Sequence, residues 1–255
     1  MIKNKESDYK NIIFDLVGVL FKLDYMKLFT RVGIIPITAY MIRHRKNPIT
    51  TLLSMLNTIS QSEIPSNFPL KYKNYSLPKS MSDWHLGQKT SNEILDEIFK
   101  HIEDLDKKHY FASKLEKKTM QNIIKVFYDS KSITATTKLN EKVVDLIKTL
   151  KHHNSNKVYL LSNIDKESYS IIQKNHKEVF NLFDGKVLSC NVNLLKPSPL
   201  IFEHIINTYH LTPNQSIFID DQKENIIAAK DIGITGLLYK NSQKTYQELE
   251  ELGVL

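Results

Sequence analysis

Cysteine and long apolar runs are scarce in this sequence, and these two absences argue against a disulfide-bonded protein and a membrane-spanning protein. The 255 residues include one cysteine, Cys190, so no disulfide can form within the chain, which favours a reducing compartment. Away from the N-terminal apolar run, the longest apolar stretch is residues 32–42, shorter than the roughly 20 residues that span a bilayer. Residues 1–10 are too polar for a signal peptide. We therefore expect a cytoplasmic protein with no membrane partner.

The charge is basic but not clustered. Lys and Arg number 35 against 28 Asp and Glu, which gives a net charge of +7 and a pI near 9.1. A basic surface favours anionic partners such as phosphorylated metabolites, nucleic acid or acidic membranes. The sequence contains no run of five or more lysines, so we expect a solvated surface and no nucleic-acid partner.

Three apolar, β-favouring stretches end in polar side chains. The residues at these ends are Asp15, Ser162, Asn163, Asp220 and Asp221. Helical patterns follow the stretches, and this alternation predicts a parallel sheet with right-handed crossovers, an α/β fold. Ligands of such sheets bind at the carboxyl ends of the strands, so the five polar side chains should face one crevice. The stretches are residues 11–14, 157–161 and 216–219, with shorter strands expected at 187–188 and 235–239.

The stretch between the first two strands has a different character. Residues 24–136 are mostly helical in pattern, with no clear strand, and include amphipathic segments at 49–59, 94–102 and 115–128. Thr90 and Glu93 have the spacing of a capping box. The predicted domains are an α/β core of residues 1–23 and 137–255 and an inserted all-helical domain of residues 24–136.

Four segments in this order resemble the four motifs of the haloacid dehalogenase (HAD) superfamily of hydrolases. They read FDLVGVL at 14–20, LSN at 161–163, KPSPLIF at 196–202 and FIDD at 218–221. The resemblance implies a Rossmann-like three-layer core, with residues 24–136 placed like the family's helical C1 cap. It also implies a hydrolase, most simply a phosphatase acting on a small phosphorylated metabolite.

The resemblance assigns the reacting groups. Asp15 would be the nucleophile that attacks phosphorus and forms an aspartyl-phosphate, which water then hydrolyses. Lys196 would neutralise the phosphoryl oxygens and keep Asp15 ionised, since a nearby cation lowers a carboxylate pKa. Ser162 and Asn163 would bind the transferring group.

The resemblance also implies a Mg²⁺ cofactor with oxygen ligands. The expected protein ligands are Asp15, the backbone carbonyl of Val17, and Asp221. Asp220 would be a ligand or lie beside the ligands, and Asn225 would orient the carboxylates. The sequence does not give the oligomeric state.

Val17 is the main departure from the family pattern. Phosphatases of the family usually carry a second Asp at this position as general acid and base, a contribution worth about 10²- to 10⁴-fold in rate. Three interpretations stay open: a phosphate whose leaving group needs little protonation, a proton donor elsewhere such as His85, or a catalytically weak or silent binding protein. A dehalogenase or phosphonatase-type hydrolase is a further alternative, although paired aspartates such as Asp220 and Asp221 favour phosphoryl transfer.

Overall fold

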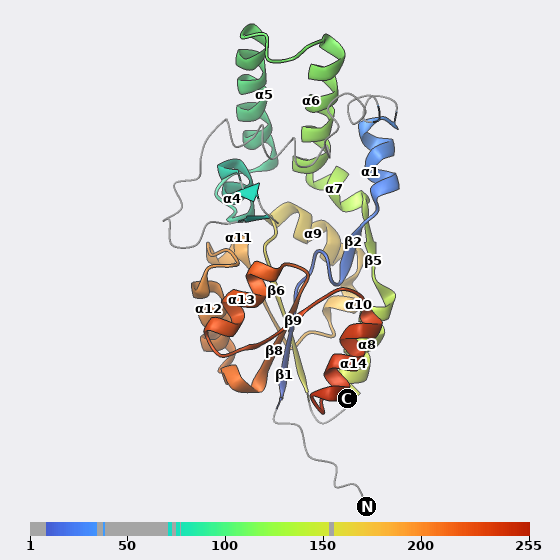
Figure 1. Cartoon of the computed structure of the whole chain (residues 1–255), viewed down its shortest axis with the longest axis vertical. Helices are drawn as coiled ribbons and strands as arrows, with labels where there is room; N and C mark the ends of the chain where they lie inside the picture. The colour runs from blue at the N-terminus through green and yellow to red at the C-terminus, as the bar shows by residue number, and fades with distance from the viewer. Residues whose placement is uncertain (1–8, 35–37, 39–70, 73–74, 77, 153–155) are drawn as a thin grey trace, which may run out of the picture. The chain divides into compact units, whose positions relative to one another are not determined.

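The computed structural model describes residues 9–34, 38, 71–72, 75–76, 78–152 and 156–255 (Figure 1). The chain divides into two compact units. Unit 1 contains the described residues of Met1–Lys22, Lys138–Asn163 and Gln173–Leu255, and unit 2 those of Leu23–Thr137 and Ile164–Ile172. These limits differ from the predicted domains chiefly in the short segment 164–172, which belongs to unit 2.

Unit 1 is built on a five-stranded parallel sheet in the order β7-β6-β1-β8-β9. The central strand β1 pairs with β6 on one side and β8 on the other, so the chain reverses its direction of winding beside β1. Such a reversal is where ligands bind in open α/β sheets. The predicted Rossmann-like core is confirmed. The strands are β1 (Asn11–Phe14), β6 (Lys157–Ser162), β7 (Gly185–Leu188), β8 (Ser216–Asp220) and β9 (Thr235–Leu238).

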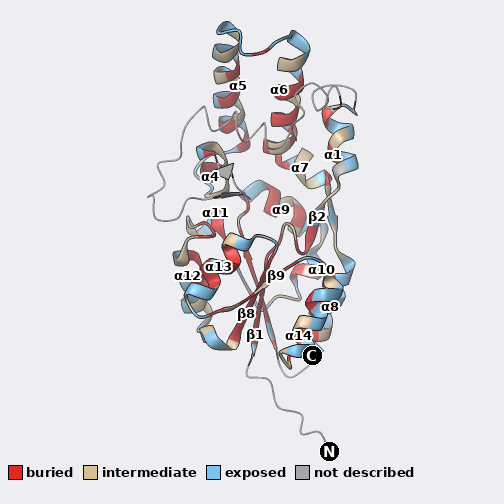
Figure 2. Cartoon of the chain, viewed as in Figure 1, coloured by how far each residue is buried: buried red, intermediate tan, exposed pale blue. Residues whose placement is uncertain are grey.

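Helices cover both faces of this sheet, which makes three layers (Figure 1). On one face, α12 (Pro199–Tyr209) and α13 (Lys223–Asp231) contact each other and the strands. On the other face, α8 (Glu141–His152) contacts β6 and α14 (Ser242–Glu251). Because side chains alternate along a strand, each strand places side chains on both faces of the sheet. The three central strands β1, β6 and β8 are buried throughout most of their length (Figure 2). The short helices are α10 (Lys177–Phe180), α11 (Ser189–Val192) and the 3₁₀ turn Pro213–Gln215.

Unit 2 is a helical assembly around its own apolar core. Its described helices are α1 (Tyr25–Val32), α4 (Lys79–His85), α5 (Ser91–Lys107), α6 (Lys114–Tyr128), α7 (Ser130–Ala135) and most of α9 (Lys166–Asn175). The long helices α5 and α6 lie side by side (Figure 1). Their apolar stripes, which include Ile94, Ile98 and Ile123, bury against Trp84 and Tyr128.

In unit 2 the structure confirms the segments predicted at 94–102 and 115–128, which are helical, and the predicted capping box, and it adds an element that the sequence analysis did not foresee. Thr90 and Glu93 form the capping box at the start of α5. The strands β3 (Lys71–Tyr72) and β4 (Tyr75–Ser76) pair antiparallel, although no strand was expected between residues 24 and 136. Two residues are too few for a period-two pattern to register. The helix predicted at residues 49–59 lies outside the described residues.

The chain crosses between the units in β2 (Phe21–Leu23) and β5 (Thr137–Leu139), which form a two-stranded sheet. Among the helices that the structure describes, none has the length and apolar character needed to cross a membrane.

Candidate active site

The strand register places three polar chain segments at one edge of the sheet. Phe14 lies opposite Leu160 on β6 and Ile219 on β8, so Asp15 follows directly beside the ends of both neighbouring strands. The backbone N–H of Asp15 donates to the carbonyl of Ile219 at 2.9 Å. Asp15 is buried although it is an acid, with 4% of its surface exposed. A buried carboxylate is costly unless it is paired, and the structure pairs it.

The partner of Asp15 is Lys196, which is also buried. Its ammonium donates to Oδ1 of Asp15 at 2.5 Å, to Oδ2 of Asp220 at 2.7 Å and to the carbonyl of Leu161 at 3.0 Å. Burial alone would lower the pKa of Lys196, but the two carboxylates outweigh burial and hold that pKa above its usual value. Lys196 is therefore a fixed positive charge between two aspartates.

A third carboxylate leaves the site with surplus negative charge. Ligand oxygens of Asp15, Asp220 and Asp221 lie within 4.8 Å of one another. The pKa of Asp15 is raised to about 8, chiefly by burial and also by the charges of Asp220 and Asp221, against the opposing effect of Lys196. Clustered carboxylate oxygens are the donor set that Mg²⁺ and Ca²⁺ prefer, so the residues present fit a divalent cation.

The three carboxylates are not equivalent. Oδ1 of Asp220 accepts from the backbone N–H of Gln222 at 2.7 Å and from Nδ2 of Asn225 at 3.1 Å. Its Oδ2 accepts from Lys196 and, at 3.0 Å, from the same amide of Asn225. A carboxylate offers about four lone-pair positions, and donors occupy those of Asp220. Asp15 and the exposed Asp221 are the carboxylates better suited to hold a cation.

Asp221 lies against the loop that follows Asp15. Gly18 in this loop has φ +107°, and a Cβ built on it would come within 2.5 Å of Cγ of Asp221. The loop closes on itself, since the N–H of Phe21 donates to Leu16 and the N–H of Gly18 donates to Phe21, both at 2.7 Å. Val17 lies inside this closed turn. Glycine is thus required both for the backbone angle and for the close approach of Asp221.

Ser162 and Asn163, at the end of β6, differ in what they contact. Oγ of Ser162 is fully buried and has no hydrogen-bond partner among the described residues. An unsatisfied buried hydroxyl costs about 1–3 kcal/mol, so this position suits a ligand oxygen. Both ends of the Asn163 amide instead bond the backbone of Lys196. Sequence reasoning missed this contact, which joins positions 33 residues apart.

His85, the candidate proton donor, lies at the end of α4 in unit 2. Its ring stacks on Trp84, with centroids 5.4 Å apart. Burial lowers the pKa of His85, and the negative charge of Asp165 partly opposes that effect. A role for His85 in proton transfer stays a prediction.

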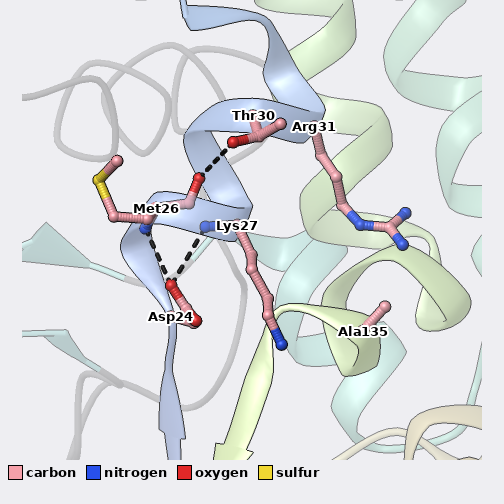
Figure 3. A pocket seen from close by; sticks show the side chains of 6 residues that line it. All are labelled: Asp24, Met26, Lys27, Thr30, Arg31 and Ala135. Atoms are coloured by element: carbon pink, nitrogen blue, oxygen red, sulfur yellow. Dashed lines mark hydrogen bonds between the residues drawn. The ribbon is translucent and has the colours of Figure 1, made fainter.

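A pocket of about 450 Å³ lies in unit 2, and none of the predicted site residues lines it. Lys27 and Arg31 extend from one face of α1 on the side of Ala135 (Figure 3). The carboxylate of Asp24 caps α1 by accepting from the backbone N–H groups of Met26 and Lys27, each at 3.1 Å. The pocket lining and the acidic cluster have no residue in common, so we do not assign the pocket to the chemistry of Asp15.

Fold and site together define a Rossmann-like α/β protein with a buried acidic centre that contains Lys196. The comparison with protein families makes this specific: the family model described as haloacid dehalogenase-like hydrolase matches residues 9–233, and the chain belongs to that family. The resemblance drawn from the four motifs is confirmed.

Individual relatives are more distant. Sesquiterpene phosphatase astK of Aspergillus oryzae is 34% identical over 95 residues, 37% of this chain and 48% of the relative. D-ribitol-5-phosphate phosphatase of Bacteroides thetaiotaomicron is 31% identical over 97 residues, 36% of this chain and 47% of the relative. The match thus spans about half the length of these curated relatives.

Among solved structures, a HAD family enzyme of Bacteroides thetaiotaomicron, crystallised with magnesium and inorganic phosphate, aligns with a TM-score of 0.55. The alignment covers 91% of this chain and 94% of that chain at 20% sequence identity. At this low sequence identity, the structural alignment shows a shared fold and nothing finer.

Proposed function

We propose that the protein is a Mg²⁺-dependent phosphatase that acts on a small phosphorylated compound through an aspartyl-phosphate on Asp15. The observation that carries the proposal is the buried Lys196 ammonium between Asp15 and Asp220, with Asp221 adding surplus negative charge. Two of the relatives are phosphatases by name, and the solved HAD enzyme was crystallised with magnesium and phosphate. These names support phosphate chemistry without naming the substrate.

The residues would act in two balanced steps. In the first, a carboxylate oxygen of Asp15 bonds to phosphorus, and the bond from phosphorus to the leaving oxygen breaks. In the second, a water oxygen bonds to the same phosphorus, the bond from phosphorus to Asp15 breaks, and inorganic phosphate leaves while the water proton passes to solvent and the Asp15 carboxylate is restored. Lys196 would neutralise phosphoryl charge in both steps, and the unpartnered hydroxyl of Ser162 would donate to a phosphoryl oxygen.

Asp15, Asp221 and the carbonyl of Val17 would hold the cation, with Asp220 and Asn225 keeping Lys196 and the strand end in place. The bound ion would supply positive charge that draws two anionic groups together. We further propose that unit 2 is the cap of the enzyme, with the core and cap divided close to residues 23 and 137.

Binding without turnover is the second candidate function, and Val17 is the observation that favours it. If the missing acid limits the rate, Val17→Asp should raise turnover of substrates with poor leaving groups by about 10²-fold or more. A folded Val17→Asp protein that is no faster than wild type would show that a proton donor at this position is not what limits the enzyme.

The test is hydrolysis of an aryl phosphate and a panel of sugar and isoprenoid phosphates, with Mg²⁺ or with chelator. We expect Mg²⁺-dependent release of phosphate and its loss in Asp15→Asn. Asp184→Asn is a matched control, because Asp184 is another ion-paired carboxylate of unit 1, bonded to Lys151 at 2.8 Å. Full activity in Asp15→Asn would show that Asp15 is not the nucleophile. Tight binding of a phosphate by wild type without turnover would favour a binding protein.

A further inference from the structure

We infer that Asn163 is a positioning residue that acts through Lys196 and does not itself bind substrate. The inference rests on the proposed function, since it concerns how the phosphate-binding cation is held. The motif-based expectation is that Asn163 contacts the transferring group through its main chain or its amide, and the inference assigns the amide to Lys196 instead.

The contact is a two-point clamp between an amide side chain and one backbone unit. Nδ2 of Asn163 donates to the carbonyl of Lys196 at 2.8 Å, and the N–H of Lys196 donates to Oδ1 of Asn163 at 2.9 Å. One residue thereby satisfies both backbone groups of Lys196, in the way that a neighbouring strand would. Both distances lie at the normal optimum for N–H···O bonds.

Lys196 needs such a clamp because it belongs to no strand or helix. It precedes α12 in a segment of turns, and its side chain must reach inward to the carbonyl of Leu161 and the carboxylates of Asp15 and Asp220. A lysine side chain has four rotatable bonds and a large rotamer entropy. Fixing its backbone restricts where the ammonium can lie.

The clamp also ties two of the motif segments together. Asn163 follows β6 directly, one residue beyond Ser162, and β6 pairs with β1. The clamp therefore fixes the backbone of Lys196 relative to β6 and β1, the strands that also position Ser162 and Asp15. Lys196 engages both polar atoms of the Asn163 amide, through one N–H and one oxygen lone pair, so the backbone of Lys196 fixes the orientation of this amide.

Asn156 provides a matched control within unit 1. It is a buried asparagine whose Nδ2 donates to the carbonyls of Leu150 at 3.3 Å and Val254 at 3.5 Å, and it contacts no site residue in these bonds. Asn156→Ala should reproduce the general cost of losing a buried amide and leave Lys196 in place.

The first test needs no turnover. The full-length protein with Mg²⁺ is treated with an amine-acylating reagent, and the rate of modification of each lysine is followed by mass spectrometry. We expect Lys196, which is 2% exposed, to be protected in wild type and Asn156→Ala and to react at least about tenfold faster in Asn163→Ala, as the loss of two hydrogen bonds implies. Equal protection of Lys196 in all three proteins would overturn the inference.

The second test is a double-mutant cycle on the activity with an aryl phosphate. Asn163→Ala should lower kcat/KM by about 10²-fold, the cost of a small misplacement of a reacting group, while Asn156→Ala changes it by less than about threefold. In a Lys196→Ala background, Asn163→Ala should have no further effect, because the two residues act as one unit. If Asn163→Ala lowered kcat/KM by the same factor in the Lys196→Ala background as in wild type, Asn163 would have a role independent of Lys196. A wild type without activity would contradict the proposed function, while the acylation rates would still decide the role of Asn163.

Discussion

Gly18 shows how tightly one residue can constrain the candidate cation site. Its replacement by alanine meets two separate obstacles, the positive φ and the Asp221 carboxylate 2.5 Å from the new Cβ. We predict that Gly18→Ala lowers the free energy of unfolding by about 1–2 kcal/mol through φ alone and also weakens Mg²⁺ binding, because Asp221 has to move. Urea unfolding and calorimetric titration with Mg²⁺ measure the two effects.

Gly233 separates these effects. It also has a positive φ, +87°, but a Cβ added there would lie 3.6 Å from its nearest neighbouring atom. Gly233→Ala should lose similar stability and keep the Mg²⁺ affinity of wild type. If Gly18→Ala bound Mg²⁺ as tightly as Gly233→Ala, Asp221 would not depend on this close approach.

The buried imidazole of His85 makes the free energy of unfolding of unit 2 depend on pH. Burial disfavours the imidazolium, so the pKa in the folded protein lies below the unfolded value of 6.5 despite the charge of Asp165. The unfolded chain binds the proton more readily, and stability is therefore retained above about pH 6.5 and lost as the pH falls below it. We predict that the free energy of unfolding drops from about pH 7 to about pH 5 and that His85→Gln reduces this drop.

Fluorescence of Trp84 reports this unfolding, because Trp84 is the sole tryptophan of the chain and stacks on His85. His152→Gln is the control, since His152 is exposed and lies in unit 1. A pH profile of His85→Gln that is the same as that of wild type would show that His85 does not contribute to acid sensitivity.

At the scale of elements, two carboxylates of unit 2 accept hydrogen bonds from residues in the first turns of three helices. Asp165 caps α9 by accepting from the N–H of Ser168 at 2.8 Å, and it accepts from the hydroxyl of Ser130, the first residue of α7, at 3.0 Å. Glu167 accepts from the hydroxyl of Ser91, the first residue of α5, at 2.9 Å and from that of Ser130 at 3.2 Å. Negative charge is favourable at helix N-termini.

Ser130→Ala should destabilise unit 2 by about 1–3 kcal/mol, because it removes the hydroxyl that donates to the buried carboxylate of Asp165. Ser170→Ala, at an exposed position of α9 where the hydroxyl bonds the carbonyl of Lys166, should change stability by less than about 0.5 kcal/mol. Urea unfolding followed by Trp84 fluorescence compares the two variants. Equal effects would mean that the carboxylate network adds no stability.

Local signals explain which elements could be predicted. The strands β1, β6 and β8 are apolar runs that end in polar residues, and the capping box of α5 is contained within four residues, so each is visible in the sequence. The helices α4, α7, α10 and α11 are four to seven residues long, too short for a periodic pattern. The segment 164–172 belongs to unit 2, and its Asp165 and Glu167 bond serines far away in sequence, contacts for which local spacing gives no signal.

The candidate site divides in the same way. Asp15, Lys196 and Asp220 were found because each lies in a motif or at a strand end, and the structure brings them into direct contact. The saturation of Asp220 by donors and the clamp of Asn163 on Lys196 depend on how separate loops meet, for which no sequence spacing gives a signal.

For the molecule as a whole, the candidate reacting groups all lie in one of the two compact units. Unit 1 contains Asp15, Lys196 and the acidic cluster, and the four motif segments lie within it. Unit 2 has its own core and a separate network of serine hydroxyls and carboxylates. Because specificity in such enzymes depends on residues outside the reacting set, the reaction class follows from unit 1 and the substrate does not.

The central claim is that Asp15 becomes covalently phosphorylated during turnover. The most direct measurement is rapid acid quenching of the full-length protein in the presence of Mg²⁺ and excess aryl phosphate, followed by mass spectrometry of its peptides. We predict a phosphoryl group on the peptide that contains Asp15, absent with chelator and absent in Asp15→Asn. Release of phosphate with no phosphoryl group on Asp15, or with the group on another residue, would contradict this mechanism.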